Sequence, residues 1–181
     1  HEIAKKLVGH QHQVIILTRN KGKAKKDLAC PAELIEGDLN LGPIQDMPPI
    51  DAVIHLLGEP VADGRWTEEK KKKIYNSRIK GTRNLKISLG NQKIHILSAS
   101  AIGYYPPSNG TELDESSLHG QDFLSKVCQD WEAEVLKIQG QHTIFRIGLV
   151  LSPMGGALSK MLPAFKMGLG ATLGHGQQWM S

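Results

Sequence analysis

The chain has 181 residues, of which 40% are hydrophobic and 22% charged, and this length and composition are typical of one globular domain with a buried core. No stretch approaches the roughly 18 consecutive apolar residues of a membrane-spanning helix, and the first residues are not of signal-peptide type, so we expect no membrane association. The net charge is +4, but the lysine run 70–73 follows two glutamates in a helical pattern without interleaved aromatic residues, which predicts a solvated helix face and no nucleic-acid binding.

The chain begins with a helical pattern over residues 2–9, and an apolar strand follows over 14–18. A parallel sheet needs an earlier strand and loop before such a helix, so we expect the natural protein to extend further at its amino terminus. The strand tip carries Arg19, with Lys21 and Lys23 nearby and no acidic residue. At this place in a dinucleotide-binding fold an acid favours NAD, whereas arginine accommodates the extra phosphate of NADP. The alternative is a lysine-rich surface turn.

Two further strand patterns follow, over residues 32–39 and 51–58. The first ends near Asp38, whose carboxylate could accept a hydrogen bond from an adenine amino group or could cap the next turn. The second ends in Gly58, and glycine at a strand end lets the backbone approach a ligand closely. His55 lies inside this apolar strand, which indicates a packed core histidine more than a ligand or a base.

A long helix is predicted from Thr67, a typical N-cap residue, to a stop near Gly90. Gly81 in its middle lowers helix stability, and a close crossing against the sheet would explain its presence.

The stretch 93–105 is the most informative part of the chain. It starts as a short apolar strand and changes abruptly to small and hydroxyl residues, including Ser98 and Ser100, followed by Tyr104 and Tyr105. Crevices outside the carboxyl ends of parallel strands bind substrates and cofactors, because polar side chains enter a cleft with apolar walls there. The alternative is a strand that runs into a Ser-Gly turn, with the two tyrosines partly covering the core.

A second long helix is predicted over residues 122–137, and Lys126 and Cys128 lie off its apolar stripe, where they could face a cleft. The stripe has four-residue spacing and consists of Phe123, Val127, Trp131 and Val135. The other cysteine, Cys30, is far away in the sequence, and no metal-type spacing is present. This indicates free thiols in a reducing, cytoplasmic setting and no metal site.

The last predicted elements are a strand over 143–151 and an apolar helix over 158–165, before a glycine-rich tail. Strand and helix patterns therefore alternate along the whole chain. This alternation predicts an α/β fold, a parallel sheet with helices on both faces.

Several motifs, in this order, resemble the extended short-chain dehydrogenases/reductases of the NAD-dependent epimerase/dehydratase family. They are residues 37–39, 53–58, 81–85, 97–104 and 145–148. A second set resembles the YfcH-type epimerase branch of that family, and the resemblance spans nearly the whole chain. This set comprises residues 58–60, 63–66, 98–105, 131–132, 155–163 and 178–181.

The resemblance implies a Rossmann-like, doubly wound NAD(P)-binding domain over residues 1–151 and the start of a smaller C-terminal substrate domain over 152–181. The family's first strand and glycine-rich phosphate loop would precede His1, and its sequence would continue past Trp179, so the chain resembles a fragment that lacks both ends. The family further implies a small-molecule, nucleotide-linked substrate and a homodimer through the two long helices.

The resemblance also assigns roles to individual residues. Arg19 corresponds to the residue that favours NADP over NAD, and Ser100 to the serine that hydrogen-bonds the reacting oxygen of the substrate. The remaining cofactor contacts fall into three groups: the adenine side, the loop after the strand 51–58, and the strand end beneath the nicotinamide. They are Asp38 and Leu39; Leu57, Gly58 and Glu59; and Arg146, Gly148 and Leu149.

One departure from the family concerns the acid/base pair. Ordinary members carry Tyr-x-x-x-Lys on the helix after the serine strand, where lysine lowers the pKa of the tyrosine. If Lys126 is the family lysine, Asp122 stands at the tyrosine position; if Glu132 sets the register, Leu124 and Cys128 occupy the two positions.

A second departure is Arg78, which replaces the family's asparagine before Gly-Thr. Tyr104 or Tyr105 could supply a substitute phenol, with Lys126 or Cys128 assisting. We therefore expect an NADP-dependent oxidoreductase or epimerase-like enzyme with an atypical acid/base set. The alternative is an NADP-binding protein without efficient turnover, a sensor or scaffold.

Overall fold

The computed structural model describes residues 2–108, 110–153, 155–172 and 176–177. Its elements alternate between helix and strand as the hydrophobic patterns predict. In chain order they are α1 (Glu2–Gly9), β1 (Ile15–Thr18), α2 (Lys21–Asp27), β2 (Glu33–Glu36), β3 (Ala52–His55), α3 (Glu68–Leu89), β4 (Ile94–Ala101), the 3-10 turn η1 (Ile102–Tyr104), α4 (Phe123–Val135), β5 (Gly140–Ile147) and α5 (Gly156–Lys166).

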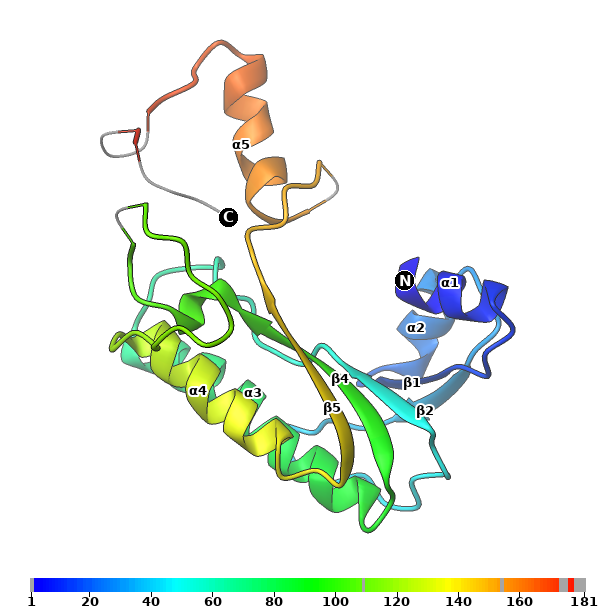
Figure 1. Ribbon diagram of the computed structural model, residues 1–181. Coiled ribbons are helices and arrows are strands. Elements are labelled where there is room, and N and C mark those ends of the chain that lie inside the picture. The colour runs from blue at the N-terminus through cyan, green and yellow to red at the C-terminus, as the bar shows by residue number, and fades with distance from the viewer. Residues whose placement is uncertain (1, 109, 154, 173–175, 178–181) are drawn as a thin grey trace.

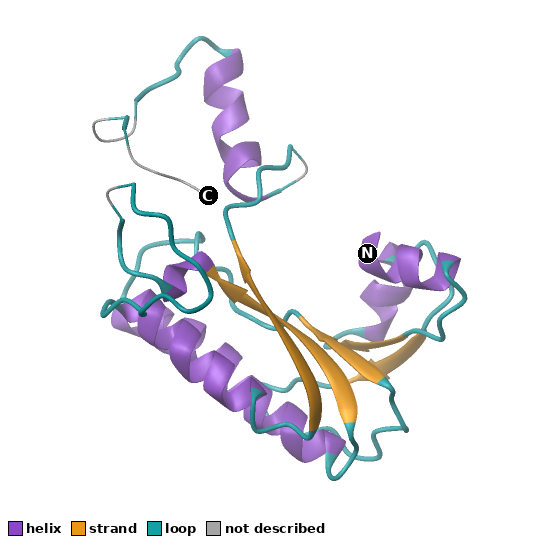
Figure 2. Ribbon diagram, viewed as in Figure 1, coloured by secondary structure: helices purple, strands orange, loops and turns teal. Residues whose placement is uncertain are grey.

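The strands form two parallel sheets within the described part of the chain. β1 pairs with β2, and β4 lies between β3 and β5. The helices α3 and α4 run side by side along one face of the three-stranded sheet, whereas α1 and α2 lie beside the two-stranded sheet on the other side (Figures 1 and 2). The predicted α/β class, with parallel strands and helices on both faces, is confirmed.

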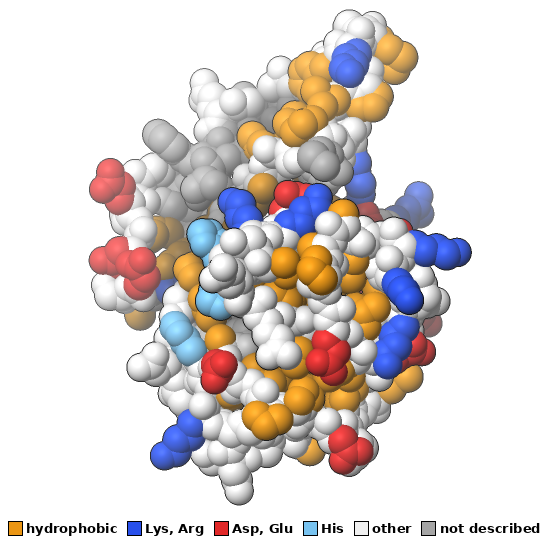
Figure 3. Space-filling model, turned by 90° about the vertical axis from the view of Figure 1, so that its right-hand side faces the viewer, with side chains coloured by type: hydrophobic (Ala, Val, Ile, Leu, Met, Phe, Trp, Pro, Cys, Tyr) orange, Lys and Arg blue, Asp and Glu red, His pale blue; other side chains and the backbone are white. Residues whose placement is uncertain are grey.

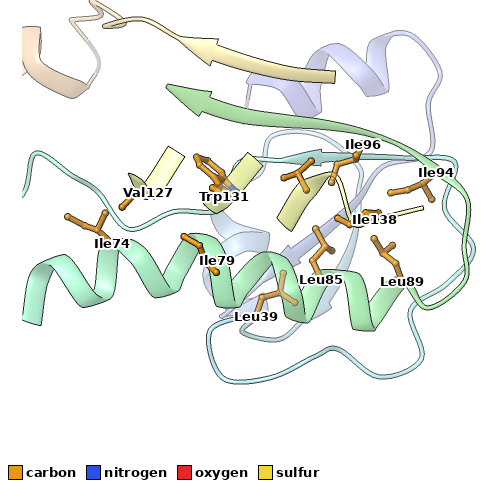
Figure 4. Close-up of a cluster of buried hydrophobic side chains, with 11 residues drawn as sticks. Leu39, Ile74, Ile79, Leu85, Leu89, Ile94, Ile96, Val127, Trp131 and Ile138 are labelled. Carbon is orange, nitrogen blue, oxygen red and sulfur yellow. The ribbon is translucent and has the colours of Figure 1, made fainter. Parts of the chain in front are cut away.

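The core fills the space between β4 and the two long helices (Figure 4). Ile74 and Ile79 of α3, Ile96 of β4, and Val127 and Trp131 of α4 are at most 5% exposed. On β4 alternate side chains are buried, because successive residues of a strand point to opposite faces. Ser98 and Ser100 follow Ile94 and Ile96 on the buried face, so the strand carries its hydroxyl groups towards α4.

The ends of α3 agree with the sequence. The side chain of Thr67 accepts a hydrogen bond from the amide of Lys70, as an N-cap does, and Gly90 ends the helix with a φ of 57°. A Cβ atom on Gly81 would collide with the side chain of Leu57. The glycine therefore allows the close crossing that the sequence predicts.

Two elements differ from the prediction. Residues 21–27 form the helix α2 instead of a simple turn, with Asn20 as the N-cap that accepts a hydrogen bond from the amide of Lys23 at 2.8 Å. The last strand is Gly140–Ile147 and not 143–151, because it pairs from its first residue with Ile94 of β4. Leu149, Val150 and Leu151 lie beyond its end and are 44–64% exposed.

The segment after β5 leads to α5, which stands beyond the carboxyl ends of β4 and β5 (Figure 1). Its Lys160 forms an ion pair with Asp63 of the loop before α3. Exposed apolar side chains gather on this segment at the top of the space-filling view (Figure 3), among them Phe165, Met167 and Leu169. The motif at 178–181 lies outside the described residues.

Among the helices of the described residues, none combines the length and the apolar character needed to cross a membrane.

Candidate functional site

The candidate site lies at the carboxyl ends of the parallel strands β4 and β5. Ser100 and Arg146 are register partners on these neighbouring strands, although 45 residues separate them in the sequence. Both side chains point towards α4, where they meet Glu132. The sheet register and the packing of α4 thus bring three polar residues from three elements together.

Glu132 is the centre of this cluster. Its Oε1 atom accepts a hydrogen bond from the Ser100 hydroxyl at 2.6 Å, and Ser100 and Glu132 are only 4% and 8% exposed. Arg146 donates to the same carboxylate through two nitrogens, Nε at 3.0 Å and Nη2 at 2.9 Å. Such charge-assisted, two-point contacts compensate the cost of burying both charges. The hydrogen bonds from the guanidinium to Glu132 raise the pKa of Arg146.

Arg146 also fastens the polar loop that follows β4. Its Nη1 atom donates to the Tyr105 hydroxyl at 2.9 Å and to the backbone carbonyl of Glu115 at 3.3 Å. The guanidinium lies over the ring of Tyr104, 3.5 Å from its centroid. Both tyrosines that the sequence singles out therefore touch the arginine, in contacts typical of cation–π pairs.

Cys128 lies one helical turn before Glu132 on α4. Its thiol is beside the Ser100 hydroxyl and the Ala101 amide, and burial raises the pKa of this thiol. Hydrogen bonds from the Ala101 amide and the Ser100 hydroxyl lower the pKa. The negative charge of Glu132 raises it, and the positive charge of Arg78 lowers it.

Arg78 approaches the same region from α3. Its guanidinium lies over the Trp131 ring at 5.2 Å, and its Nη1 atom donates to the carbonyls of Glu59 and Ile74 at 3.1 Å each. Burial lowers the pKa of Arg78. A Cβ atom on Gly58 would lie 2.8 Å from the Arg78 Cζ atom, so glycine is needed there to admit the guanidinium.

Lys126 is not brought to Ser100. Its side chain is 70% exposed, and its ammonium group pairs with Asp130 at 3.2 Å. The Asp130 carboxylate also accepts a hydrogen bond from the Tyr75 hydroxyl of α3 at 2.7 Å. Residues two apart on an α-helix differ by about 200° in direction. Lys126 and Asp130 therefore face nearly opposite to Cys128 and Glu132.

The residues expected on the adenine side of a cofactor follow β1 and β2. Arg19 is exposed at the end of β1 and lines a hollow of about 330 Å³ between β1 and α2. Asp38 caps its own turn, since its carboxylate accepts a hydrogen bond from the Asn40 amide at 2.8 Å. Leu39 is buried, and its carbonyl accepts a hydrogen bond from Asn84 of α3.

The residues expected after β3 form a second group. Leu57 packs against Gly81 of α3. Glu59 forms an ion pair with Lys70 at 2.8 Å. The Lys70 ammonium lowers the pKa of Glu59, and the charge of Arg19 contributes to the same shift, so the ends of β1 and β3 lie near each other.

The expected residues after β5 do not share one environment. Gly148 follows the end of the strand, and Leu149 is 44% exposed. Arg146 is turned to Glu132 and the two tyrosines, as described above. Among the described residues, no group of three or more metal-ligating side chains is present.

Glu132 enters the sequence-based predictions as part of the motif at 131–132 and as a marker of register, without a role of its own. The sequence feature that points to a role for Glu132 is its position next to Trp131 on the apolar side of α4. A carboxylate at a buried helix position requires a partner. The partner could not be identified from the sequence, because only the strand register places Arg146 opposite Ser100.

The comparisons with known proteins show the family. A sequence profile of the NAD dependent epimerase/dehydratase family matches residues 1–180. The chain is 34% identical to the chloroplastic SDR39U1 homolog of Arabidopsis thaliana, an epimerase family protein, over 99% of the chain and 54% of that protein. It is 36% identical to the epimerase family protein YfhF of Bacillus subtilis over 94% of the chain and 57% of that protein.

Two solved structures share the fold. The human epimerase family protein SDR39U1, isoform 2, crystallised with NADPH, has a TM-score of 0.78 at 28% identity, covering 97% of this chain and 59% of that one. A nucleoside-diphosphate sugar epimerase of Corynebacterium glutamicum has a TM-score of 0.67 at 31% identity, covering 94% of this chain and 35% of that one. The chain thus spans little more than half the length of the relatives described above, or less.

Proposed function

Because this chain belongs to the NAD dependent epimerase/dehydratase family, we propose that it acts as an NADP-dependent oxidoreductase or epimerase-like enzyme with an atypical acid/base set. Its substrate is a small molecule linked to a nucleotide, in keeping with the similar nucleoside-diphosphate sugar epimerase of Corynebacterium glutamicum. Bound NADP would supply the hydride chemistry, and residues 152–181 would begin the substrate region.

The observation that carries the proposal is the basic end of β1. Arg19 is exposed there, and within the described residues it forms no ion pair that would occupy its guanidinium. Lys23 lines the same hollow. An arginine at this strand tip that forms no ion pair with an acidic side chain fits the 2′-phosphate of NADP better than the free ribose hydroxyls of NAD. The human relative crystallised with NADPH supports the same preference.

In this proposal Ser100 orients the reacting oxygen of the substrate, and Tyr104 contributes to the wall of the crevice. Leu57, Gly58 and Glu59 lie at the end of β3, where the backbone could line the cofactor. Lys126 keeps a catalytic role only if α4 rearranges, because its ammonium group is turned towards Asp130.

A second candidate function is NADP binding without efficient turnover, as in a sensor or scaffold. Two observations favour it: the Ser100 proton is engaged by Glu132, and Lys126 faces away from the crevice. The homodimer and the cytoplasmic location stay predictions, and one relative is chloroplastic.

The first experiment is a titration of the full-length protein with NADPH and with NADH, comparing the wild type with Arg19→Asp. Loss of one charge-assisted phosphate contact corresponds to about 1.5–3 kcal/mol, or roughly 10- to 150-fold in affinity. Lys25→Asp is the matched control, since Lys25 lies near the other end of α2. Equal NADPH affinity in the wild type and Arg19→Asp would overturn the role of Arg19.

A second experiment separates turnover from binding. NADPH oxidation is followed with sugar nucleotides that carry a carbonyl group, and NADP reduction with sugar nucleotides that carry only hydroxyl groups, with Ser100→Ala as the comparison. Turnover that is lost while NADPH affinity is retained supports the enzyme, whereas tight binding with no turnover of any candidate in the wild type supports the sensor or scaffold.

A further inference from the structure

Glu132 is a buried carboxylate whose position depends on the fold and not on its sequence neighbours. It lies under the Ser100 hydroxyl, with an O···O distance of 2.6 Å. This distance is typical of a hydroxyl that donates to an ionised carboxylate. A serine has only one hydroxyl proton, so this contact directs the Ser100 proton into the protein and not into the crevice.

The carboxylate itself cannot turn freely. Arg146 holds both of its oxygens, at 3.0 and 2.9 Å. Arg146 is in turn held by the Tyr105 hydroxyl and by the ring of Tyr104. The direction of one serine hydroxyl therefore depends on residues of β5, α4 and the turn after β4.

We propose that Glu132 is a positioning residue that fixes Ser100 as a hydrogen-bond acceptor towards the crevice. The Ser100 Oγ atom then presents its lone pairs to the substrate, so it pairs with a group that carries a proton. The substrate class that fits is an alcohol, whose hydroxyl donates to Ser100, in preference to a ketone or aldehyde. This inference rests on the proposed oxidoreductase function and specifies the reacting group.

Cys128 offers a way to test the direction of the Ser100 proton without a substrate. Its thiol is beside the Ser100 hydroxyl, and a hydrogen bond from this hydroxyl would lower the Cys128 pKa. Glu132 and the Cys128 thiolate therefore compete for one serine proton. If Glu132 holds the proton, Ser100 cannot donate to Cys128. Removing the Ser100 hydroxyl should then leave the Cys128 pKa nearly unchanged, and it should matter only once Glu132 is altered.

The experiment is a double-mutant cycle read out by thiolate absorbance in the full-length, cofactor-free protein in which Cys30, and every cysteine outside residues 1–181, is replaced by serine. Glu132→Ala should lower the Cys128 pKa, because a neighbouring negative charge is removed, and it also removes the oxygen that accepts the Ser100 proton. In the Glu132→Ala protein, Ser100→Ala should raise the Cys128 pKa by about one unit or more, as expected for a lost hydrogen bond to a charged group. In the protein with Glu132 intact, the same substitution should have little effect.

Glu134→Ala is the matched control, because Glu134 is a buried carboxylate on the same helix but pairs with Arg83 and Lys137. It should leave the Cys128 titration and its response to Ser100→Ala unchanged. Glu132→Asp keeps the charge but shortens the side chain, so it tests the same contact if Glu132→Ala fails to fold. It should also make the Cys128 pKa sensitive to Ser100→Ala.

The proposal is overturned if Ser100→Ala shifts the Cys128 pKa equally with and without Glu132. Its failure is distinct from failure of the proposed function, since the thiol titration needs no cofactor and NADPH binding needs no Glu132. With turnover established, Glu132→Ala should retain NADPH affinity and lose at least tenfold in alcohol oxidation, and Glu132→Asp should lose activity as well, because its shorter side chain does not hold the Ser100 proton. Full activity in Glu132→Ala would contradict the positioning role.

Discussion

His55 makes the stability of the protein depend on pH. Its ring is 3% exposed at the end of β3, where Nε2 lies 2.8 Å from the Thr82 hydroxyl. The Trp131 indole N–H donates to the same nitrogen at 3.3 Å. Burial lowers the pKa of His55 from 6.5 to about 4. The folded protein therefore keeps this histidine neutral under conditions in which the unfolded chain would protonate it.

The sign and the size of the effect follow from linkage. The folded-state pKa is below the unfolded value, so this contribution to stability is complete above about pH 6.5 and is lost as the pH falls towards 4. A shift from 6.5 to about 4 corresponds to about 3 kcal/mol in total at 1.36 kcal/mol per unit. Between about pH 7.5 and pH 5 the loss from this one group is about 2 kcal/mol.

The assay is urea unfolding of the full-length protein at these two pH values, comparing the wild type with His55→Gln. At the higher pH the variant is expected to be less stable than the wild type. On acidification to the lower pH, however, the unfolding free energy of the variant should fall by about 2 kcal/mol less than that of the wild type. His12→Gln is the control, because His12 is exposed. An identical pH dependence in the wild type and His55→Gln would refute the reasoning.

Three further predictions concern packing and capping. Ile96→Ala in the centre of β4 should cost about 2–5 kcal/mol in unfolding free energy, whereas Ile87→Ala, at a side chain 62% exposed on α3, should cost far less. Gly58→Ala should destabilise the protein, because the added methyl group displaces the Arg78 guanidinium. In an Arg78→Ala background the same substitution should be nearly neutral. Denaturant titrations of the wild type, the two single variants and the double variant test this. Thr67→Ala should cost about 1 kcal/mol through the lost N-cap, with recovery in Thr67→Ser as measured by thermal unfolding.

The class of the fold was predictable because apolar periodicity differs between strands and helices. The pattern placed β4 between two long helices, and capping chemistry located both ends of α3. The helix α2 was missed since it has almost no apolar residues and carries lysines throughout. Its existence depends on Asn20 as a cap and on the position of the helix against β2, and a period analysis detects neither.

The candidate site was predictable only in part. Ser100 could be located because the change from apolar to hydroxyl residues marks the end of a buried strand. Its partners Glu132 and Arg146 lie far along the sequence, and their approach requires the pairing of β5 with β4 in one register. A shift of one residue would turn Arg146 to the other face of the sheet, so this cluster is a property of the tertiary structure.

The same reasoning explains why the acid/base residues are hard to assign from sequence. Lys126 and Cys128 both lie off the apolar stripe of α4, yet they face nearly opposite directions on the helix. The side of α4 that carries Lys126 meets Tyr75 through Asp130, and the side that carries Cys128 meets Ser100. Proton chemistry at this crevice would therefore draw on the face of Cys128 and Glu132, and a lysine two residues away contributes only if the helix itself turns.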